Sequence, residues 1–274
     1  MPVIELDNIT KTYGRGGFFR KQERFTVLNN VDLSLRAGEC LGLVGRSGSG
    51  KSTLGRIMLG LEAPDSGTVR ILGQNVTGRK TLPTGLRRAV QVVFQDAIGS
   101  SNPRLTAGEI IAEPLRNFDK LKGRQLKDRV AELLEQVGLS PDDANKLPGR
   151  FSGGQLQRIC IARALAPSPR VIVLDEAVSS LDMLIQARIL DLLTDLRKKH
   201  DTAYLFVTHD LRLVRRFCDR AFFMSDGSLH AFDPEKMADM KGSKALEELF
   251  NAILPPMPDS ERTSDGQRLD QVAV

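Results

Sequence analysis

The stretch Gly45-Arg46-Ser47-Gly48-Ser49-Gly50-Lys51-Ser52 decides the fold of this 274-residue chain. It matches the pattern G-x-x-x-x-G-K-[ST], and it stands between the two elements that this pattern requires. The apolar run Cys40 to Val44 precedes it with the length of a strand, and a helix is predicted from Lys51 to about Leu61. A strand, a glycine-rich loop and a helix in this order predict an α/β fold with a phosphate-binding loop.

The loop predicts a site for a nucleoside triphosphate and its metal ion. Its glycines let backbone N–H groups converge at a helix N-terminus, whose partial positive charge favours anions. Lys51 is expected to neutralise the β and γ oxygens of ATP, and the Ser52 hydroxyl is expected to ligate Mg2+. ATP and Mg2+ are therefore the predicted ligands. The residues expected to bind ATP here are Gly45, Arg46, Ser47, Gly48, Ser49, Gly50, Lys51, Ser52 and Thr53.

Further strands follow from apolar runs on both sides of the loop. Val90 to Phe94, Val171 to Leu174 and Ala203 to Val207 are uninterrupted, which is typical of strands buried on both faces of a parallel sheet. Shorter β-like runs near the N-terminus, around a loop rich in glycine and arginine, predict an antiparallel β region. These shorter runs are Val3 to Leu6, Val27 to Leu35 and Gly67 to Leu72.

A helical segment interrupts the predicted sheet. Apolar residues from Val130 to Val137 recur at i, i+3, i+4 and i+7, and Gly138 follows as a C-cap. Core strands stand on both sides of this segment, so we interpret residues 103–166, approximately, as an inserted helical subdomain. Residues 1–254 are then one domain, and residues 255–274 form a polar tail without periodicity that we expect to be loose.

Polar side chains that follow the core strands are candidates for catalysis. The strand Val171 to Leu174 ends in Asp175 and Glu176. Asp175 is placed to hold the Mg2+ shell, and Glu176 can polarise the attacking water. His209 follows the next strand and is a candidate contact to the γ-phosphate, whereas Gln95 follows an earlier one. Taken alone, the acids could cap a helix and the histidine could be structural.

Composition excludes several classes. The chain is 41% hydrophobic and 27% charged, which is ordinary for a globular protein and excludes disordered, collagen-like and disulfide scaffolds. The net charge of +5 is dispersed, apart from the clusters Arg15 to Arg24 and Lys120 to Arg129. With two Tyr and no Trp for stacking, no nucleic-acid partner is predicted. The chain shows neither an 18-residue apolar stretch nor a signal peptide, so we expect it in the cytoplasm.

The spacing of the three cysteines predicts neither a disulfide bond nor a metal cluster. Cys40, Cys160 and Cys218 are far apart in the sequence, and each lies in an apolar run. This pattern indicates buried thiols in a reducing compartment. The histidines His200, His209 and His230 form no spacing suited to a ligand set either.

A second turn that is suited to binding an anion carries the resemblance of this chain to a known family. Phe151-Ser152-Gly153-Gly154-Gln155 opens a predicted helix that runs to Leu165, and it resembles the Leu-Ser-Gly-Gly-Gln signature of ABC transporter ATP-binding cassettes, with Phe151 in place of Leu. The other elements of the family stand in order around it. They are the aromatic Tyr13, the phosphate loop, Gln95, the acids Asp175 and Glu176, the segment Ser179-Ser180-Leu181-Asp182, and His209.

The resemblance implies a RecA-like P-loop NTPase core with a parallel sheet, an antiparallel β subdomain and the inserted helical subdomain. It also implies a head-to-tail dimer, in which Ser152, Gly153, Gly154 and Gln155 cap the ATP held by the partner cassette. Hydrolysis then depends on assembly. Because Glu176 and His209 are both present, the chain is predicted to be a competent ATPase, not an inactive interaction protein. A kinase would have no use for the signature.

By the same resemblance, individual residues take family roles. Tyr13 would stack on adenine, and Asp182 would contact the partner cassette. Gln95 would link Mg2+ or water to a membrane subunit. His209 would stabilise charge on the γ-phosphate. The implied catalytic residues are Glu176, His209 and Gln95, and the implied Mg2+ ligands are Ser52, Gln95 and Asp175.

One segment narrows the resemblance to a branch of the family. Residues 94–115, with the turn Asn102-Pro103-Arg104, resemble the peptide and nickel importers, as do residues 27–31, 175–182, 205–214 and 251–255. Many peptide importers of this branch carry a cysteine-containing extension near the C-terminus, so the absence of a cysteine after Cys218 favours nickel over peptide cargo. A dipeptide, an oligopeptide or a metal chelate is the alternative cargo. A soluble ABC ATPase outside transport is a remote alternative, since no long coiled-coil insert or second cassette is present.

The branch also implies the assembly. The expected partners are a second cassette, usually a different chain, two transmembrane permease subunits and, indirectly, a periplasmic substrate-binding protein. The chain would then be a peripheral protein on the cytoplasmic face of the inner membrane. Cargo recognition would belong to other subunits.

Overall fold

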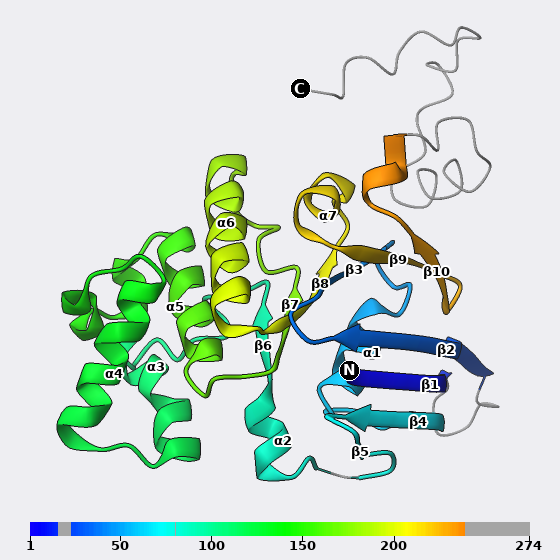
Figure 1. Ribbon diagram of the computed structural model, residues 1–274, viewed down its shortest axis with the longest axis horizontal. Helices are drawn as coiled ribbons and strands as arrows, with labels where there is room; N and C mark the ends of the chain where they lie inside the picture. The colour runs from blue at the N-terminus through cyan, green and yellow to red at the C-terminus, as the bar shows by residue number, and fades with distance from the viewer. Residues whose placement is uncertain (16–22, 80, 239–274) are drawn as a thin grey trace, which may run out of the picture.

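The computed structural model describes residues 1–15, 23–79 and 81–238 (Figure 1). The predicted tail at 255–274, the segment 251–255 and most of the first basic cluster lie outside the described residues. Within the described part, two sheets and a group of helices make up the fold. No helix among these residues has the length and apolar character needed to cross a membrane.

A six-stranded sheet lies at the centre, in the order β10-β9-β3-β8-β7-β6. Strands β9, β3, β8, β7 and β6 are parallel, and β10 pairs with β9 in the antiparallel sense. The four apolar runs predicted as core strands are β3, β6, β7 and β8, and they lie side by side as expected. The strands are β3 (Cys40–Gly45), β6 (Val90–Phe94), β7 (Val171–Asp175), β8 (Ala203–Thr208), β9 (Arg220–Ser225) and β10 (Ser228–Phe232).

This sheet is apolar on both faces because it separates two cores. In β8, Tyr204 and Phe206 enter one core, whereas Leu205 and Val207 enter the other. Side chains alternate along a strand, so an unbroken apolar run fills both sides. The first core continues into the inserted helices, and the second continues into the antiparallel sheet.

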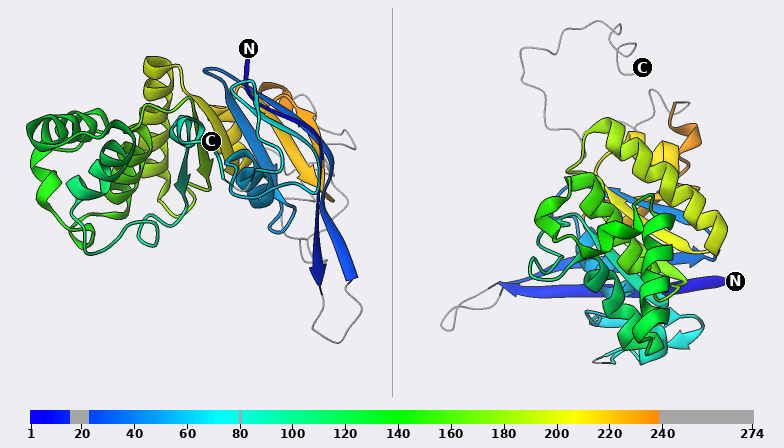
Figure 2. Two further views of the ribbon diagram at one scale, coloured as in Figure 1. Left: turned by 90° about the horizontal axis from the view of Figure 1, so that it is seen from below. Right: turned by 90° about the vertical axis from the view of Figure 1, so that its left-hand side faces the viewer.

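The antiparallel sheet has the order β2-β1-β4-β5. As predicted, it is built from the N-terminal runs, but β1 and β2 each reach 14 residues, and their paired ends project from the body (Figure 2). Polar residues such as Lys11 and Thr12 extend the strands because cross-strand pairing holds them. The strands are β1 (Pro2–Arg15), β2 (Glu23–Arg36), β4 (Ser66–Ile71) and β5 (Gln74–Asn75).

The predicted helical insert lies between β6 and β7 and gathers at one end of the molecule (Figure 1). Its helices, including a π-helical turn and two short 3-10 turns, span residues 107–165, and α4 ends just before Gly138, whose φ is 71°. The elements are α3 (Ala107–Pro114), η1 (Leu115–Asp119), α4 (Gly123–Gln136), η2 (Pro141–Asn145), η3 (Pro148–Arg150) and α5 (Gly153–Leu165).

Helices α1, α2, α6 and α7 connect strands, whereas the short 3-10 turn η4 follows β10. Helix α1 ends three residues before the predicted Leu61, and the left-handed φ of 64° at Gly60 accounts for the stop. Helix α5 begins at Gly153 because Ser152 caps it. The elements are α1 (Lys51–Met58), α2 (Thr84–Ala89), α6 (Met183–His200), α7 (Leu211–Phe217) and η4 (Glu235–Ala238).

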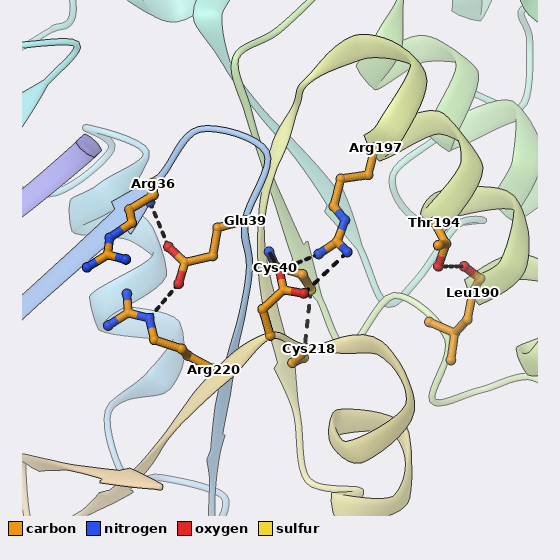
Figure 3. Close-up of polar contacts among 9 residues, drawn as sticks. Arg36, Glu39, Cys40, Leu190, Thr194, Arg197, Cys218 and Arg220 are labelled. Atoms are coloured by element: carbon orange, nitrogen blue, oxygen red, sulfur yellow. Dashed lines mark hydrogen bonds and ion pairs between the residues drawn. The ribbon is translucent and has the colours of Figure 1, made fainter. Parts of the chain in front are cut away.

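Strand β3 is fastened at its start by two carboxylates (Figure 3). Glu39 accepts hydrogen bonds from the Arg220 Nε, at 2.5 Å, and from the Arg36 backbone N–H, at 2.8 Å. Asp219 accepts from the Cys40 backbone N–H, at 2.8 Å, and from the Arg197 guanidinium, at 2.7 Å. These bonds fix one end of the strand whose other end enters the phosphate loop.

The three thiols are free and buried, as the sequence predicted. Their separation in the sequence is misleading for two of them, because folding brings the Cys40 and Cys218 sulfur atoms to 3.7 Å (Figure 3). Burial raises the pKa of the Cys40 thiol well above its ordinary value. Both thiols therefore serve as packing groups at the base of β3.

Candidate active site

The central sheet gathers the candidate residues at one edge. Val44 of β3 pairs with Thr208 of β8, and Asp175 of β7 pairs with Val207 of β8 and Phe94 of β6. The segments that leave these four parallel strands therefore emerge together at their carboxyl ends. Those segments carry the phosphate loop, Gln95, Glu176 and His209, so these groups lie at the same end of the sheet.

Glycine backbone angles shape the phosphate loop. Gly48 and Gly50 have φ of 81° and 110°, in the left-handed region. At Gly50 a Cβ would lie 2.8 Å from the Val27 carbonyl oxygen, so only glycine fits against β2. Helix α1 then begins at Lys51 without a side-chain cap on its first N–H groups. Uncapped donors at a helix N-terminus suit a phosphate.

Lys51 completes the cationic side of the loop. Its Nζ donates to the backbone oxygens of Gly45, at 2.7 Å, and Arg46, at 2.8 Å. Burial lowers the pKa of this ammonium, while the nearby charges of Glu176 and Asp175 act in the opposite direction. The ammonium is therefore held at the loop by carbonyl oxygens and faces acids, a position from which it can reach phosphate oxygens.

Two adjacent acids form the anionic side. Burial, and secondly the charge of Glu176, raises the pKa of the Asp175 carboxyl. Glu176 has a left-handed φ of 48°, which is strained for a residue with a Cβ. Two backbone bonds hold it there: its N–H donates to the Val207 oxygen, and its oxygen accepts from the Ser179 N–H. These two bonds thus hold the Glu176 backbone at an unfavourable angle and fix the position from which its carboxylate extends.

His209 lies beside this carboxylate. Its Nδ1 is 3.6 Å from the Glu176 Oε1, which is too long for a hydrogen bond. The His209 side chain is 60% exposed and that of Glu176 is 26% exposed, so both can meet a molecule bound over the loop. The structure therefore brings together Lys51, Asp175, Glu176 and His209, and leaves Gln95 exposed after β6.

The aromatic residue expected to stack on adenine has other contacts. The Tyr13 hydroxyl donates to the Glu62 carboxylate at 2.5 Å, and the Lys11 Nζ lies 5.6 Å from the centre of its ring. The ring of Phe25, its cross-strand neighbour, lies 5.9 Å away. Sequence reasoning did not single out Lys11, Phe25 or Glu62. The alternation of residues on paired strands is the signal that could have found Phe25.

The signature residues and the phosphate loop lie in different layers of the fold. The signature begins α5, which packs into the first core, whereas the loop leads into α1, which packs into the second core on the other face of the central sheet. Ser152 caps α5, since its Oγ accepts from the Gln155 N–H while the Gln155 side chain accepts from the Ser152 N–H. A Cβ on Gly154 would lie 2.6 Å from Ile185, so α5 begins close to α6, which Asp182 caps. Helix α5 packs on α3, α4, α6 and β6, whereas α1 packs on β2, β3, β4 and β7.

The raised pKa of Asp175 predicts a conflict between stability and binding. A carboxyl with a raised pKa costs the fold stability above that pKa, and the cost disappears as pH falls toward its ordinary value of 3.8. Asp175→Asn should therefore raise the Tm of the nucleotide-free chain by about 2 °C at neutral pH, a small change because solvent screens the site.

The same variant should lose the Mg2+ dependence of ATP affinity. Calorimetry across pH, combined with ATP titrations with and without Mg2+, measures both effects. The difference in Tm between variant and parent should shrink as pH is lowered. A lower Tm, or an intact response to Mg2+, would contradict the prediction.

Fold and site together define a class of protein: a P-loop ATPase whose helical insert carries a second anion-ready helix start. The match to the ABC transporter family covers residues 28–179. Two relatives are nickel import ATP-binding proteins NikE: that of Rhodospirillum rubrum is 46% identical over 97% of this chain and 96% of its own length, and that of Brucella suis is 46% identical over 94% and 97%. The chain belongs to the ABC transporter family, and it is an ATPase.

A solved structure agrees with this assignment. The ATP-binding cassette MJ0796, in a dimeric post-hydrolysis state bound to ADP and Pi, superposes with a TM-score of 0.73 at 34% identity. The match covers 84% of this chain and 98% of MJ0796. The predicted architecture, an ABC nucleotide-binding domain, is therefore confirmed. The roles of individual residues and the domain boundaries stay predictions.

Proposed function

We propose that this chain is the ATP-hydrolysing subunit of a nickel importer. The assignment of nickel as the cargo rests on the 46% identity of this chain, along nearly its whole length, to proteins named for nickel import. The observation that supports hydrolysis is the convergence of Lys51, Asp175, Glu176 and His209 at the edge of the sheet.

The site suits Mg2+ together with ATP. Two adjacent carboxylates, one with a raised pKa, carry negative charge that a divalent cation would offset. In our proposal Ser52, Asp175 and Gln95 would hold Mg2+, directly or through water. When bound, the ion would neutralise part of the phosphate charge.

The side chains of the chain itself then divide the reaction. Lys51 and the N–H groups at the start of α1 bind the phosphates and offset their charge. Glu176 accepts a hydrogen bond from the attacking water and polarises it, because its backbone is fixed by Val207 and Ser179. His209, beside that carboxylate, contacts the γ-phosphate oxygens.

The site becomes complete only in a pair of cassettes. Ser152 and Gly153 at the start of α5 are exposed and lie on another layer from the loop of the same chain. We propose that they cap the ATP of a partner cassette in a head-to-tail dimer. Two permease subunits would complete the complex at the cytoplasmic face of the inner membrane, with a periplasmic binding protein delivering cargo.

Uptake of radiolabelled nickel by the reconstituted complex tests this proposal. We expect ATP-dependent uptake of free nickel that excess dipeptide or chelated metal leaves unchanged. A complex that contains Lys51→Ala in this chain is the matched control for energy coupling, and it should show only leakage. Transport of a dipeptide in place of nickel would favour the peptide alternative and overturn the cargo assignment.

A further inference from the structure

The segment between β6 and α3 is tied along the signature helix α5 through its own backbone. The Phe94 carbonyl oxygen accepts from the Gln157 Nε2, at 3.4 Å, and the Ser100 carbonyl oxygen accepts from the Arg163 Nη1, at 2.6 Å. Between these two contacts the Cys160 thiol donates weakly to the carbonyl oxygen of residue 97, at 3.8 Å. The segment 94–101 is therefore held at three points.

The spacing of these contacts makes them one row. Gln157, Cys160 and Arg163 follow one another at intervals of three, so they share one face of the helix. The carbonyls at 94, 97 and 100 also follow at intervals of three. Gln157 is 1% exposed and Cys160 is 0% exposed, so these two side chains are shielded from water, whereas Arg163 at the end of the row is partly exposed. A buried carbonyl needs a donor, and here side chains of α5 supply it.

Both partners in this row carry predicted site residues. Gln95 lies inside the tied segment, one residue after the Phe94 carbonyl. Ser152 caps the same helix, five residues before Gln157. In Figure 1, α5 lies beside β6, and the two elements are in contact. Under the proposed function, Gln95 faces the ATP of its own chain, whereas Ser152 faces the ATP of the partner.

We propose that Gln157 and Arg163 are positioning residues that couple the two nucleotide sites of the dimer. Because Gln157 and Arg163 hold the backbone of residues 94–101 to α5, Gln95 and Ser152 move as one unit. Contact of Gln95 with the nucleotide of its own chain then favours contact of Ser152 with the partner's nucleotide. This inference rests on the proposed pairing of cassettes, and it identifies the physical link that such coupling requires.

The chain provides a matched control on the same helix. Arg158 donates from its Nη1 to the Val137 carbonyl oxygen, at 3.0 Å, a bond of the same chemistry to the end of α4. Arg163→Met and Arg158→Met therefore each remove one arginine–carbonyl bond from α5. Only the first loosens the segment that contains Gln95. A purely structural role would affect the two variants alike.

The measurement is ATP turnover of the assembled complex as a function of ATP concentration. Arg163→Met should lower turnover about tenfold and bring the Hill coefficient to about 1, while the Kd of the isolated chain for ATP changes less than about twofold. Arg158→Met should keep the parental Hill coefficient. Arg163→Lys should recover part of the turnover, because it restores a donor, and Gln157→Met should change turnover in the same direction as Arg163→Met.

The outcomes separate the coupling from the pairing on which it rests. Equal loss in Arg163→Met and Arg158→Met, or a parental Hill coefficient in Arg163→Met, overturns the coupling alone. A parent complex whose own Hill coefficient is about 1 counts against the pairing of cassettes, and the coupling falls with it.

Discussion

Glu176→Gln should lower ATP turnover about 10²- to 10⁴-fold, the range that a positioned general base contributes. The amide has nearly the shape of the carboxylate but cannot draw a proton from water. The contacts that hold the residue at φ 48°, with Val207 and Ser179, come from the backbone and are unaffected by the substitution. The loss should therefore lie in the chemical step.

Binding should survive in the same variant. The residues expected to hold the phosphates, Lys51 and the start of α1, are unchanged, so the Kd for ATP should stay within about threefold of the parent. Steady-state hydrolysis and equilibrium binding of a fluorescent ATP analogue measure the two quantities. Glu135→Gln, an exposed residue on α4, is the control for removal of a negative charge. Parental turnover in Glu176→Gln would refute the role of this carboxylate.

Ser152→Arg should abolish most of the turnover of the assembled complex, by about 10²-fold, a loss typical of removing donors from a developing charge. Ser152 is exposed at the first turn of α5, and an arginine there fills the space in which a partner's ATP would bind. The isolated chain should still bind ATP normally, because its own loop is on another layer.

Ser140→Arg controls for loss of a helix cap. Ser140 also forms a capping box, with Asp143, at the start of a short helix in the same insert. Each substitution should cost about 1 kcal/mol of stability through the lost cap. In the complex with Ser152→Arg, labelling of the partner chain by an azido-ATP analogue should decrease. In the complex with Ser140→Arg, this labelling should stay at the parental level. Unchanged labelling in both would reject the composite site.

Much of the fold could be predicted because its signals are local. An unbroken apolar run shows a strand buried on both faces, and the residue after it then falls at the edge of the sheet, as for Glu176 and His209. Strands β9 and β10 were not predicted, although the apolar run at 221–224 in β9 obeys the same rule.

The rest depended on contacts between distant residues. The Tyr13 hydroxyl meets Glu62, 49 positions away, and Gln157 meets the Phe94 carbonyl, 63 positions away. The sequence around each residue does not reveal its partner, because only the folded chain brings the two groups together. The same holds for Cys40 and Cys218, which are 178 positions apart and yet in contact.

The backbone angle at Glu176 has a consequence for how this protein responds to selection. A left-handed φ of 48° is adopted more easily by glycine or asparagine, and the adjacent Asp175 is an acid with a raised pKa. Two neighbouring positions therefore work against thermal resistance. A laboratory lineage propagated for heat tolerance alone should replace these acids early, and the variants that survive best should be those that no longer turn over ATP.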